Sequence, residues 1–202
     1  EATAKRYLPA AELSKLKSAT ASNPQCEYAR KLFLFSYYCY GISFIDMAML
    51  TTAHIKQMED GDYIVYKRQK IKRQKGVKPI SIKITPAIRQ LIGSLQAASP
   101  TVDDFLLPIV TRSGYTGERL YMHIRTRYSK YQKYLRLLAE ELGIDFHLTS
   151  YVSRHTAAMT LQRNHIPREV ISQMLGHADL ETTNIYLDSF DNEVINEAAK
   201  VL

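Results

Sequence analysis

The sequence predicts an α+β fold that is mostly α-helical and carries a small antiparallel β-hairpin. Apolar residues recur at the 3.6-residue helical period over 88–95 and 120–142. By contrast, 63–66 and 79–84 alternate β-branched or aromatic residues with polar ones, as half-buried strands do. The 202 residues suffice for one domain with a core, and 46% hydrophobic with 23% charged residues exclude a disordered or collagen-like chain.

The first quarter of the chain is expected to form three helices. One opens at Pro9, which suits the first turn of a helix, and the second spans 26–38 and is ended by Gly41. Ser43 and Asp46 have the N-cap and N3 spacing of a capping box, which opens the third helix.

A β-hairpin is expected over 62–84, after the turn signal Asp60-Gly61. The segment between its two strands is long and basic. It contains a short repeat, KRQKI at 67–71 and KRQKG at 72–76.

The middle of the chain returns to helices. Thr85-Pro86 opens one, a loop rich in Pro, Gly, Ser and Thr covers 99–118, and a long helix spans 120–142. The stripe that the long helix is expected to bury consists of Ile124, Tyr128, Tyr131, Leu135 and Leu138.

The last quarter predicts a helix–turn–helix. Helices over 150–163 and 167–175 flank a short turn, and Gly176 ends the second of them. Two more helices are expected over 180–187 and 193–202. Taken alone, a helix–turn–helix indicates DNA binding.

Positive charge is gathered into two stretches. The net charge is +7, and eight Lys and Arg fall within 67–83 and six within 119–136, neither of which contains an acidic residue. Such stretches favour a polyanionic partner bound through its phosphates, and the alternative is two solvated faces. The residues expected to contact phosphates are Lys67, Arg68, Lys72, Arg73, Lys78, Arg125, Arg127, Lys130 and Lys133.

Several classes of protein are excluded. No apolar run reaches the roughly 18 residues that cross a bilayer, and no basic-then-apolar leader opens the chain. Cys26 and Cys39 are too few for a disulfide scaffold and lack the spacing of a zinc site. We therefore expect no metal, no cofactor and a reduced, cytoplasmic environment.

Three motifs stand in order near the C-terminus, namely YVSRH at 151–155, LGH at 175–177 and TTNIY at 182–186. Arg154 precedes His177 by 23 residues, and His177 precedes Tyr186 by nine. In these motifs and their spacing the chain resembles the tyrosine recombinases of the phage integrase family, especially the integrases of mobile elements. The resemblance extends over essentially the whole chain.

The resemblance implies that the chain cleaves and rejoins DNA through a 3′-phosphotyrosine, without metal or ATP. Tyr186 would attack phosphorus, Arg154 would bind two phosphate oxygens through its planar fork, and His177 would donate a further hydrogen bond. A hairpin lysine would protonate the 5′-hydroxyl leaving group. Counting from the first strand gives Lys70 and counting from the second gives Lys75, because KRQK occurs twice.

Two positions depart from the family pattern. Tyr151 stands where the family usually has His, and a phenol donates one hydrogen bond but carries no positive charge. The first catalytic Arg falls on Ser43 in the usual pattern and on Tyr40 in the mobile-element pattern. Either another cation replaces it, with Arg30, Arg68 and the hairpin lysines as candidates, or the chain is a DNA-binding relative with weakened or no activity.

The resemblance also implies an assembly. Residues 1–202 would form a single catalytic domain, without the N-terminal core-binding domain that completes the DNA clamp. The implied partner is double-stranded DNA with attachment or recombination sites, held by a homo-tetramer, whereas the isolated fragment would be a monomer. Helix 193–202 is a candidate for packing on a neighbouring protomer. The implied location is the bacterial cytoplasm, at the nucleoid.

Overall fold

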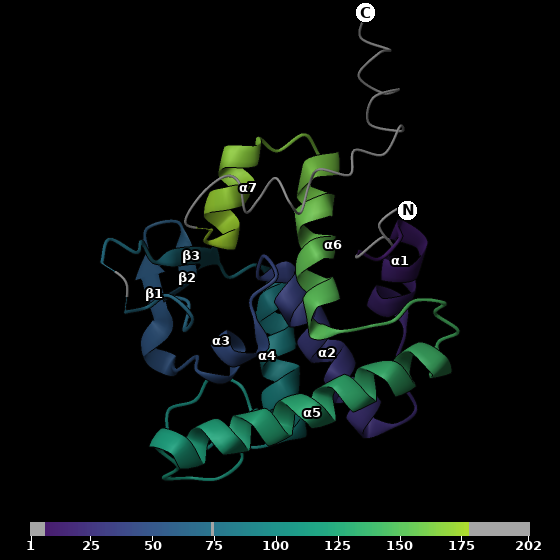
Figure 1. Cartoon of the computed structure of the whole chain (residues 1–202), viewed down its shortest axis with the longest axis horizontal. Helices are drawn as coiled ribbons and strands as arrows, with labels where there is room; N and C mark the ends of the chain where they lie inside the picture. The colour runs from purple at the N-terminus through teal and green to yellow at the C-terminus, as the bar shows by residue number, and fades with distance from the viewer. Residues whose placement is uncertain (1–6, 74, 178–202) are drawn as a thin grey trace, which may run out of the picture.

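The computed structural model describes residues 7–73 and 75–177 of the chain (Figure 1). These residues form the mostly helical fold with a small antiparallel sheet that the sequence predicts. In chain order the elements are α1 (Ala10–Ser18), α2 (Pro24–Tyr38), α3 (Phe44–Ala48), the 3₁₀ helix η1 (Thr52–His54), β1 (Ile55–Met58), β2 (Gly61–Tyr66), β3 (Ile80–Lys83), α4 (Pro86–Ala98), α5 (Gly117–Glu141), α6 (Ser150–Arg163) and α7 (Arg168–Leu175).

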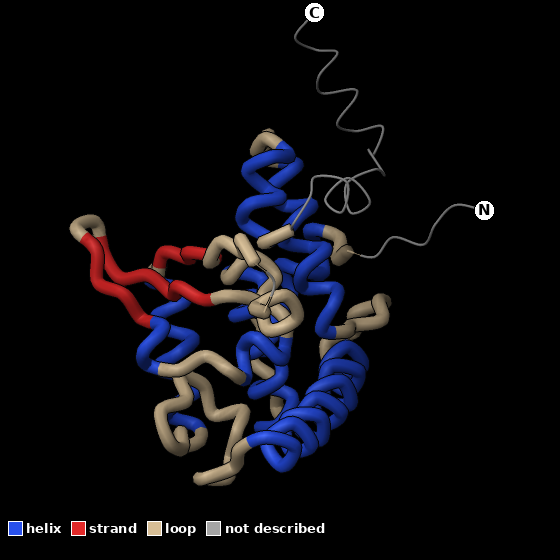
Figure 2. Tube along the Cα trace, turned by 60° about the vertical axis from the view of Figure 1, so that its left-hand side comes forward, coloured by secondary structure: helices blue, strands red, loops and turns tan. Residues whose placement is uncertain are grey.

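The sheet has three strands in the order β1–β2–β3, one more than the expected hairpin (Figure 2). Ile64 of β2 pairs with Ile55 of β1 and with Ile82 of β3, both antiparallel. The sequence does not predict β1, because its IKQM segment holds one β-branched residue and no apolar alternation. The expected pairing of β2 with β3 is confirmed, and residues 67–79 between them are called the basic connector below.

Side-chain caps fix where three helices begin. The side chains of Asn23, Ser43 and Thr85 accept hydrogen bonds from backbone N–H groups in the first turns of α2, α3 and α4. The Asn23 cap starts α2 at Pro24, two residues before the expected start. The Ser43 cap is confirmed, and it accepts from the backbone N–H of Asp46 at 3.2 Å.

Helix α2 is the centre of the core. It packs against α4, α5 and α6. Leu32, Phe33 and Phe35 on it are fully buried at 0% exposure, and a helix that is apolar on all sides is a core element. In Figure 1, α5 crosses one end of this core and α6 stands beside α2, with the sheet on the other side.

Helix α5 buries most of its expected stripe but not all of it. Ile124, Tyr131, Leu135 and Leu138 are buried. Tyr128, expected in the same stripe, is 36% exposed. It lies at the edge of the stripe, with its ring 5.3 Å from that of Phe44 and its hydroxyl 3.0 Å from the Ser150 hydroxyl at the start of α6.

Helices α6 and α7 form the expected helix–turn–helix pair. The two helices do not both lie on the surface, as a DNA-reading unit would require. Almost every residue of α6 from Val152 to Met159 is buried. Small side chains at Ser153 and Ala157 let α6 approach α2 closely, and the Ser153 hydroxyl lies 2.7 Å from that of Ser36. Helix α6 is therefore largely a core helix that exposes Tyr151 in its first turn, whereas α7 exposes a flank to solvent.

The chain enters the fold along α6. The backbone N–H of Leu8 donates to the Thr156 hydroxyl at 3.0 Å in a buried bond. Tyr7 packs with Met159 and Ile171, and the Arg163 guanidinium lies 5.2 Å from the centre of the Tyr7 ring. Among the helices in the described ranges, none is long and apolar enough to cross a membrane.

Candidate active site and nucleic-acid interface

Arg154, in the second turn of α6, lies at the centre of the candidate site. Its side chain is nearly buried, with 4% of the residue exposed. Nη1 donates to the carbonyl of Gly41 at 3.0 Å and Nη2 to the carbonyl of Leu175 at 2.6 Å. The turn after α2 and the end of α7 thereby fix one guanidinium in one orientation, which is the preorganisation that an oxyanion site requires.

Two glycines make this close packing possible. Gly41 has φ +71°, and a Cβ built on it would overlap the backbone of Arg154. Gly176 has φ +63°, and a Cβ there would overlap the Ile80 side chain and approach that of Arg68. Both positions combine a left-handed backbone with a close approach, so only glycine fits without strain.

His177 directly follows Gly176 and faces Arg154. Its Nε2 lies 2.9 Å from Nη2 of Arg154. Because a guanidinium only donates, His177 accepts at Nε2 and carries its proton on Nδ1 in this arrangement. The two residues that the LGH and YVSRH motifs single out are thus in direct contact.

Arg68, in the basic connector, brings a second guanidinium to the same place. Its Nη1 donates to the carbonyl of Gly176 at 3.2 Å. With Arg154 and Ser43 it lines a cavity of about 430 Å³. Arg30, the other arginine considered as a replacement, lies elsewhere, because Glu27 and the carbonyl of Leu16 hold it at 2.7 Å each.

Asp46 ties the basic connector to helix α3. Its residue is 3% exposed, one carboxylate oxygen accepts from the Ser43 hydroxyl at 2.6 Å and the other from the backbone N–H of Gln69 at 2.7 Å. Asp46 is thus the capping partner of Ser43 that the sequence predicts and also a tertiary acceptor for the backbone of the basic connector. Gln69 lies between Arg68 and Lys70, so the carboxylate fixes the backbone from which both cations project.

The pKa of the Tyr66 phenol depends on several of these charges. Burial raises the pKa of Tyr66 above its ordinary value, and the negative charge of Asp46 raises it further. The positive charges of Arg154 and Arg68 act in the opposite direction on the same pKa. The charges of Asp46 and of both guanidiniums therefore all act on the pKa of one buried phenol.

The whole of this arrangement falls within a match to a protein family. The model described as the phage integrase family matches residues 6–193. The chain belongs to the phage integrase family.

Relatives of this integrase-family chain are tyrosine recombinases. It is 31% identical to the recombinase XerC of Rhodospirillum centenum over 114 residues, which is 56% of this chain and 31% of that protein. It is 43% identical to XerD of Halalkalibacterium halodurans over 54 residues, or 27% of this chain and 18% of that protein. The matched part thus spans a third or less of these relatives.

Solved structures of the same family share the fold. The XerA recombinase superimposes with a TM-score of 0.65 at 22% identity, over 96% of this chain and 64% of that one. The integrase of transposon Tn1549, solved with transposon right end DNA, gives a TM-score of 0.65 at 12% identity, over 100% of this chain and 68% of that one.

The two candidate lysines of the integrase-family pattern sit in different surroundings. Lys75 lines a cavity of about 720 Å³ together with His177 and Lys78. Lys70 is exposed in the turn that follows Gln69, the residue fixed by Asp46. Both lysines remain predictions, because Lys75 shares a cavity with His177 and Lys70 follows the residue that Asp46 fixes.

The departing positions have clear local roles. Ser43 is the N-cap of α3, and Tyr40 occupies a left-handed turn at φ +58°. Neither side chain carries a positive charge. Tyr151 is 51% exposed and its ring meets that of His155 edge-on at 4.7 Å. It lines the cavity that contains Arg154, where its phenol replaces the expected imidazole.

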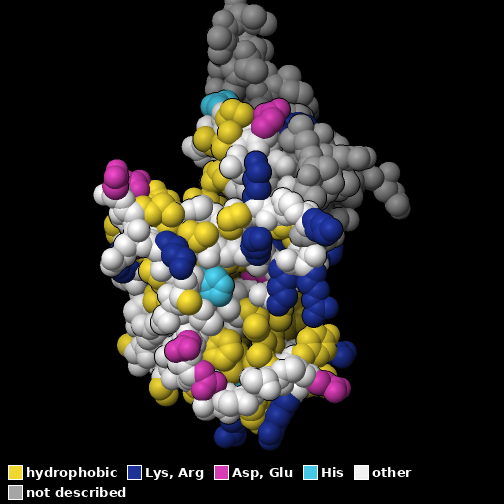
Figure 3. All heavy atoms as spheres, turned by 90° about the vertical axis from the view of Figure 1, so that its left-hand side faces the viewer, with side chains coloured by type: hydrophobic (Ala, Val, Ile, Leu, Met, Phe, Trp, Pro, Cys, Tyr) yellow, Lys and Arg dark blue, Asp and Glu magenta, His cyan; other side chains and the backbone are white. Residues whose placement is uncertain are grey.

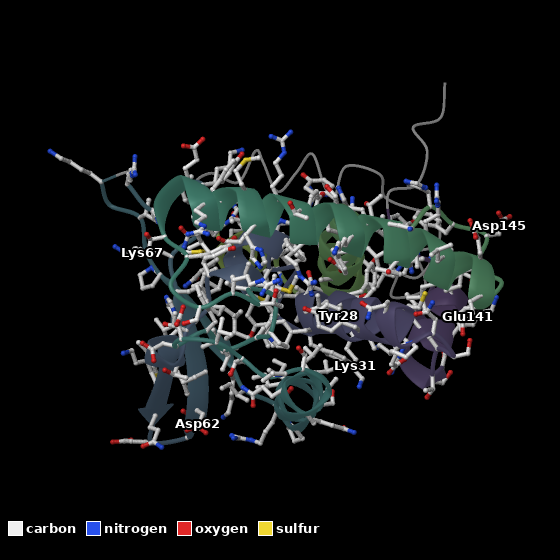
Figure 4. The ribbon with its side chains drawn as sticks, turned by 90° about the horizontal axis from the view of Figure 1, so that it is seen from below. Tyr28, Lys31, Asp62, Lys67, Glu141 and Asp145 are labelled. Atoms are coloured by element: carbon white, nitrogen blue, oxygen red, sulfur yellow. The ribbon has the colours of Figure 1, made fainter. Side chains whose placement is uncertain are left out.

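The predicted phosphate contacts come from the basic connector and α5, and one of them is directed toward a neighbouring helix. Figure 4 labels Lys67 at the end of the molecule where α5 begins, and Glu141 at the opposite end of that helix. Arg127 is directed toward α2, because its guanidinium lies 5.8 Å from the ring centre of Tyr28. Exposed predicted contacts are Lys67, Lys72, Arg73, Lys78, Arg125, Lys130 and Lys133.

On the face seen in Figure 3, Lys and Arg side chains border a hollow that exposes hydrophobic side chains. The sequence does not predict these hydrophobic contributions. Phe44, Tyr121 and Tyr128 line the Arg154 cavity. Tyr121 and Tyr128 stand as aromatic residues within the basic stretch 119–136, but periodicity assigns Tyr128 to the core.

Tyr186 and helices 180–187 and 193–202 lie outside the described residues. Within 7–73 and 75–177, no group of three or more His, Cys, Asp or Glu is placed to hold a metal ion.

Proposed function

We propose that this chain is the catalytic part of a tyrosine-type site-specific recombinase or integrase, with residues 1–202 as one catalytic domain. The observation that carries the proposal is a pair of guanidiniums, Arg154 and Arg68, over one cavity, with His177 in contact with Arg154. Two fixed guanidiniums suit a phosphodiester, whose non-bridging oxygens gain negative charge in the transition state.

In the proposed reaction the Tyr186 phenol gives up its proton to water, its oxygen attacks phosphorus, and the bond to the 5′ oxygen breaks. A connector lysine, Lys70 or Lys75, gives a proton to that oxygen, and the 3′-phosphotyrosine keeps the energy of the broken bond. Attack by another 5′-hydroxyl reverses the step and rejoins DNA. The phenol needs the nearby positive charge, because its unperturbed pKa is about 10.

Arg68 takes the place of the missing first arginine in this proposal. Losing one preorganised donor costs about 10²–10³-fold in rate, so an enzyme without a substitute would be severely slowed. The bond from Arg68 to the carbonyl of Gly176 supports the substitution, because Gly176 lies between the end of α7 and His177. Tyr151 adds a neutral hydrogen-bond donor at the same cavity.

The proposed partner is double-stranded DNA, gripped through the exposed cations of the basic connector and α5. The proposed assembly is a homo-tetramer that holds two recombination sites, at the nucleoid of a bacterial cell. XerH has been solved bound to its difH substrate, which supports the choice of DNA as the ligand class.

A second candidate function is DNA binding without cleavage. It is favoured by Ser43 and Tyr40 at the positions of the first arginine. The two functions share the basic surface and differ in whether a covalent bond to DNA forms.

Covalent trapping separates the two candidates. The chain is incubated with a pool of duplexes that are randomised around a nick, so that cleavage releases a short 5′ strand and prevents rejoining. Adducts are recovered on a denaturing gel, with Tyr186→Phe as the matched control. We expect an adduct with the parent chain that the control lacks.

Each other outcome has a fixed meaning. Binding on a native gel without any adduct establishes the DNA-binding candidate in place of the enzyme. An adduct that persists in Tyr186→Phe rejects the assigned nucleophile. Failure to bind DNA at low salt rejects both candidates.

A further inference from the structure

The cavity that holds Arg154 has more aromatic surface than a phosphate site needs. Its wall is formed by the side chains of Phe44, Tyr121, Tyr128 and Tyr151, with Ile45 and Ile124 beside them. We call this cavity the aromatic groove. Phosphate oxygens gain nothing from such a wall, so its chemistry points to a flat apolar group as well as to an anion.

The exposed fraction of these rings separates those that pack in the core from those that face solvent. Phe44 is a core ring, 6% exposed and stacked on Tyr131 at 5.1 Å. Tyr128 is held by the Ser150 hydroxyl. Tyr121 and Tyr151, however, are 58% and 51% exposed on the two helices that border the groove, α5 and α6. The Tyr151 ring meets that of His155 edge-on at 4.7 Å, and about half of its surface still faces solvent. Tyr121 exposes still more of its ring, so both residues offer aromatic surface on the border of the groove.

The charge of the groove narrows the occupant. Arg68, Arg125 and Arg154 line it, and no Asp or Glu is among the described residues that do. A ligand that fits therefore has a planar apolar body with negative charge close to it. A single nucleotide unit of DNA has that composition, with the base as the flat body and phosphates on either side.

Pairing decides when a base can enter. A base within a duplex must leave its stack and its partner, which costs more than one new stacking contact returns. A base that is mismatched, bulged or next to a strand break has lost much of that stabilisation already. The groove is therefore selective for unpaired bases.

We infer that the aromatic groove captures one unpaired nucleobase next to the phosphate held by Arg154, stacking it on Tyr121 or Tyr151. The inference rests on the proposed function, since it takes DNA as the ligand. It assigns the exposed tyrosines of α5 and α6 to strand handling, in addition to the chemistry at phosphorus.

The test compares three duplexes of equal length and sequence. One is fully paired, one carries a single bulged adenine, and one carries an abasic residue at the bulge, which keeps the phosphate charge but has no base. Affinity is measured by fluorescence anisotropy at fixed salt. We expect the bulged duplex to bind about tenfold tighter than the abasic one, as one stacking contact provides.

Two variants make the test specific. Tyr121→Ala is expected to reduce the preference for the bulged base severalfold. Met122→Ala is the matched control, because Met122 is the next residue, is 50% exposed and does not line the groove. It should keep the preference.

The outcomes are distinguishable from those of the proposed function. Equal affinity for the bulged and abasic duplexes, with clear binding of both, overturns the inference and leaves DNA binding intact. A preference that Tyr121→Ala and Tyr151→Ala both leave unchanged also overturns it. No binding to any of the three duplexes overturns the proposed function itself.

Discussion

A guanidinium serves a phosphate only if its N–H groups are directed to where the phosphate will lie. Arg68 meets this condition, because it is held at the carbonyl of Gly176 and lines the groove with Arg154. Arg30 does not, because Glu27 and the Leu16 carbonyl occupy its N–H groups. At the residue scale, Arg68 therefore lies at the proposed site, whereas Arg30 is held in a structural ion pair.

Arg68→Ala should slow formation of the covalent DNA adduct by about 10²–10³-fold, as loss of one preorganised donor does. Arg30→Ala should leave the adduct rate unchanged and lower the thermal midpoint, because it removes the two hydrogen bonds that Arg30 donates to the half-buried Glu27 carboxylate. Single-turnover adduct kinetics and thermal melting check both. An Arg68→Ala chain as fast as the parent would show that Arg68 is not the substitute.

Glu27 gives a pH dependence of stability. Burial alone would raise the pKa of its carboxyl, but the hydrogen bonds from Arg30 and from the Ala21 N–H, together with the positive charges of Arg30 and Lys31, hold it below its ordinary value. A lowered pKa in the folded state means that the stabilisation is complete above the unfolded pKa and is lost as pH falls through the folded one.

The difference in urea midpoint between the parent and Glu27→Gln should therefore be largest at neutral pH and shrink below about pH 4. The measurement is urea unfolding by circular dichroism at several pH values. A gap that widens on acidification would contradict the assignment.

At the scale of elements, Asp46 joins α3 to the basic connector through one carboxylate. Asp46→Asn removes a charge and one acceptor while keeping the shape. We expect faster hydrogen exchange at the Gln69 amide and slower adduct formation, with little change in exchange across α2. Unchanged protection of the Gln69 amide would mean that the connector holds its place without Asp46.

Gly41 and Gly93 form a matched pair of alanine tests. Gly41→Ala forces a Cβ against the backbone of Arg154 at a left-handed φ, so it should destabilise the fold by about 1–3 kcal/mol or more. Gly93 lies inside α4 with nothing within 4 Å of a built Cβ, so Gly93→Ala should stabilise by about 0.5–1 kcal/mol. Thermal denaturation measures both, and effects of the same sign would refute the reasoning.

The elements that the sequence predicts well are those whose ends carry local signals. Ser150 to Arg163 matches α6 at both ends, and Gly176 ends α7 in a left-handed conformation. Strand β1 lacks such a signal, because pairing with β2 and not its own composition makes it a strand. The burial of α6 is likewise set by its neighbours, which a helical period alone does not reveal.

The candidate site shows the same limit. The LGH and YVSRH motifs predict that His177 and Arg154 lie in one site, because their spacing matches that of the family whose site contains both residues. The i,i+3 spacing of Glu27 and Arg30 in a predicted helix permits their ion pair, but nothing in the sequence places Arg68 at the carbonyl of Gly176, because that contact depends on the fold. The second contact of Asp46, to Gln69, is tertiary for the same reason.

At the scale of the whole molecule, positive charge lies on the connector and α5, while the α1–α2 end carries paired charges. Lys15 and Lys31 on that end contact Glu12 and Glu27. Binding to DNA should therefore weaken steeply with salt, since phosphate contacts release counterions.

Neutralising Lys67 and Arg73 should lower the slope of log K against log salt by about 0.9 for each phosphate contact removed. Neutralising Lys15 and Lys31 changes the net charge equally and should leave the slope unchanged. Salt titrations of DNA affinity with both double variants check this. Equal slopes for the two variants would mean that net charge, and not its placement, determines binding.

The attachment of Tyr7 and Leu8 to α6 has a mechanical consequence. A pulling force applied at residue 7 would first load the bond from Leu8 to Thr156, two residues beyond Arg154. The same tension would reach α7 through the packing of Tyr7 on Ile171. Helices α6 and α7 would thus bear the load together. These are the helices that carry Arg154 and the Leu175 carbonyl to which it donates, so tension at this end of the described fold is transmitted to the site.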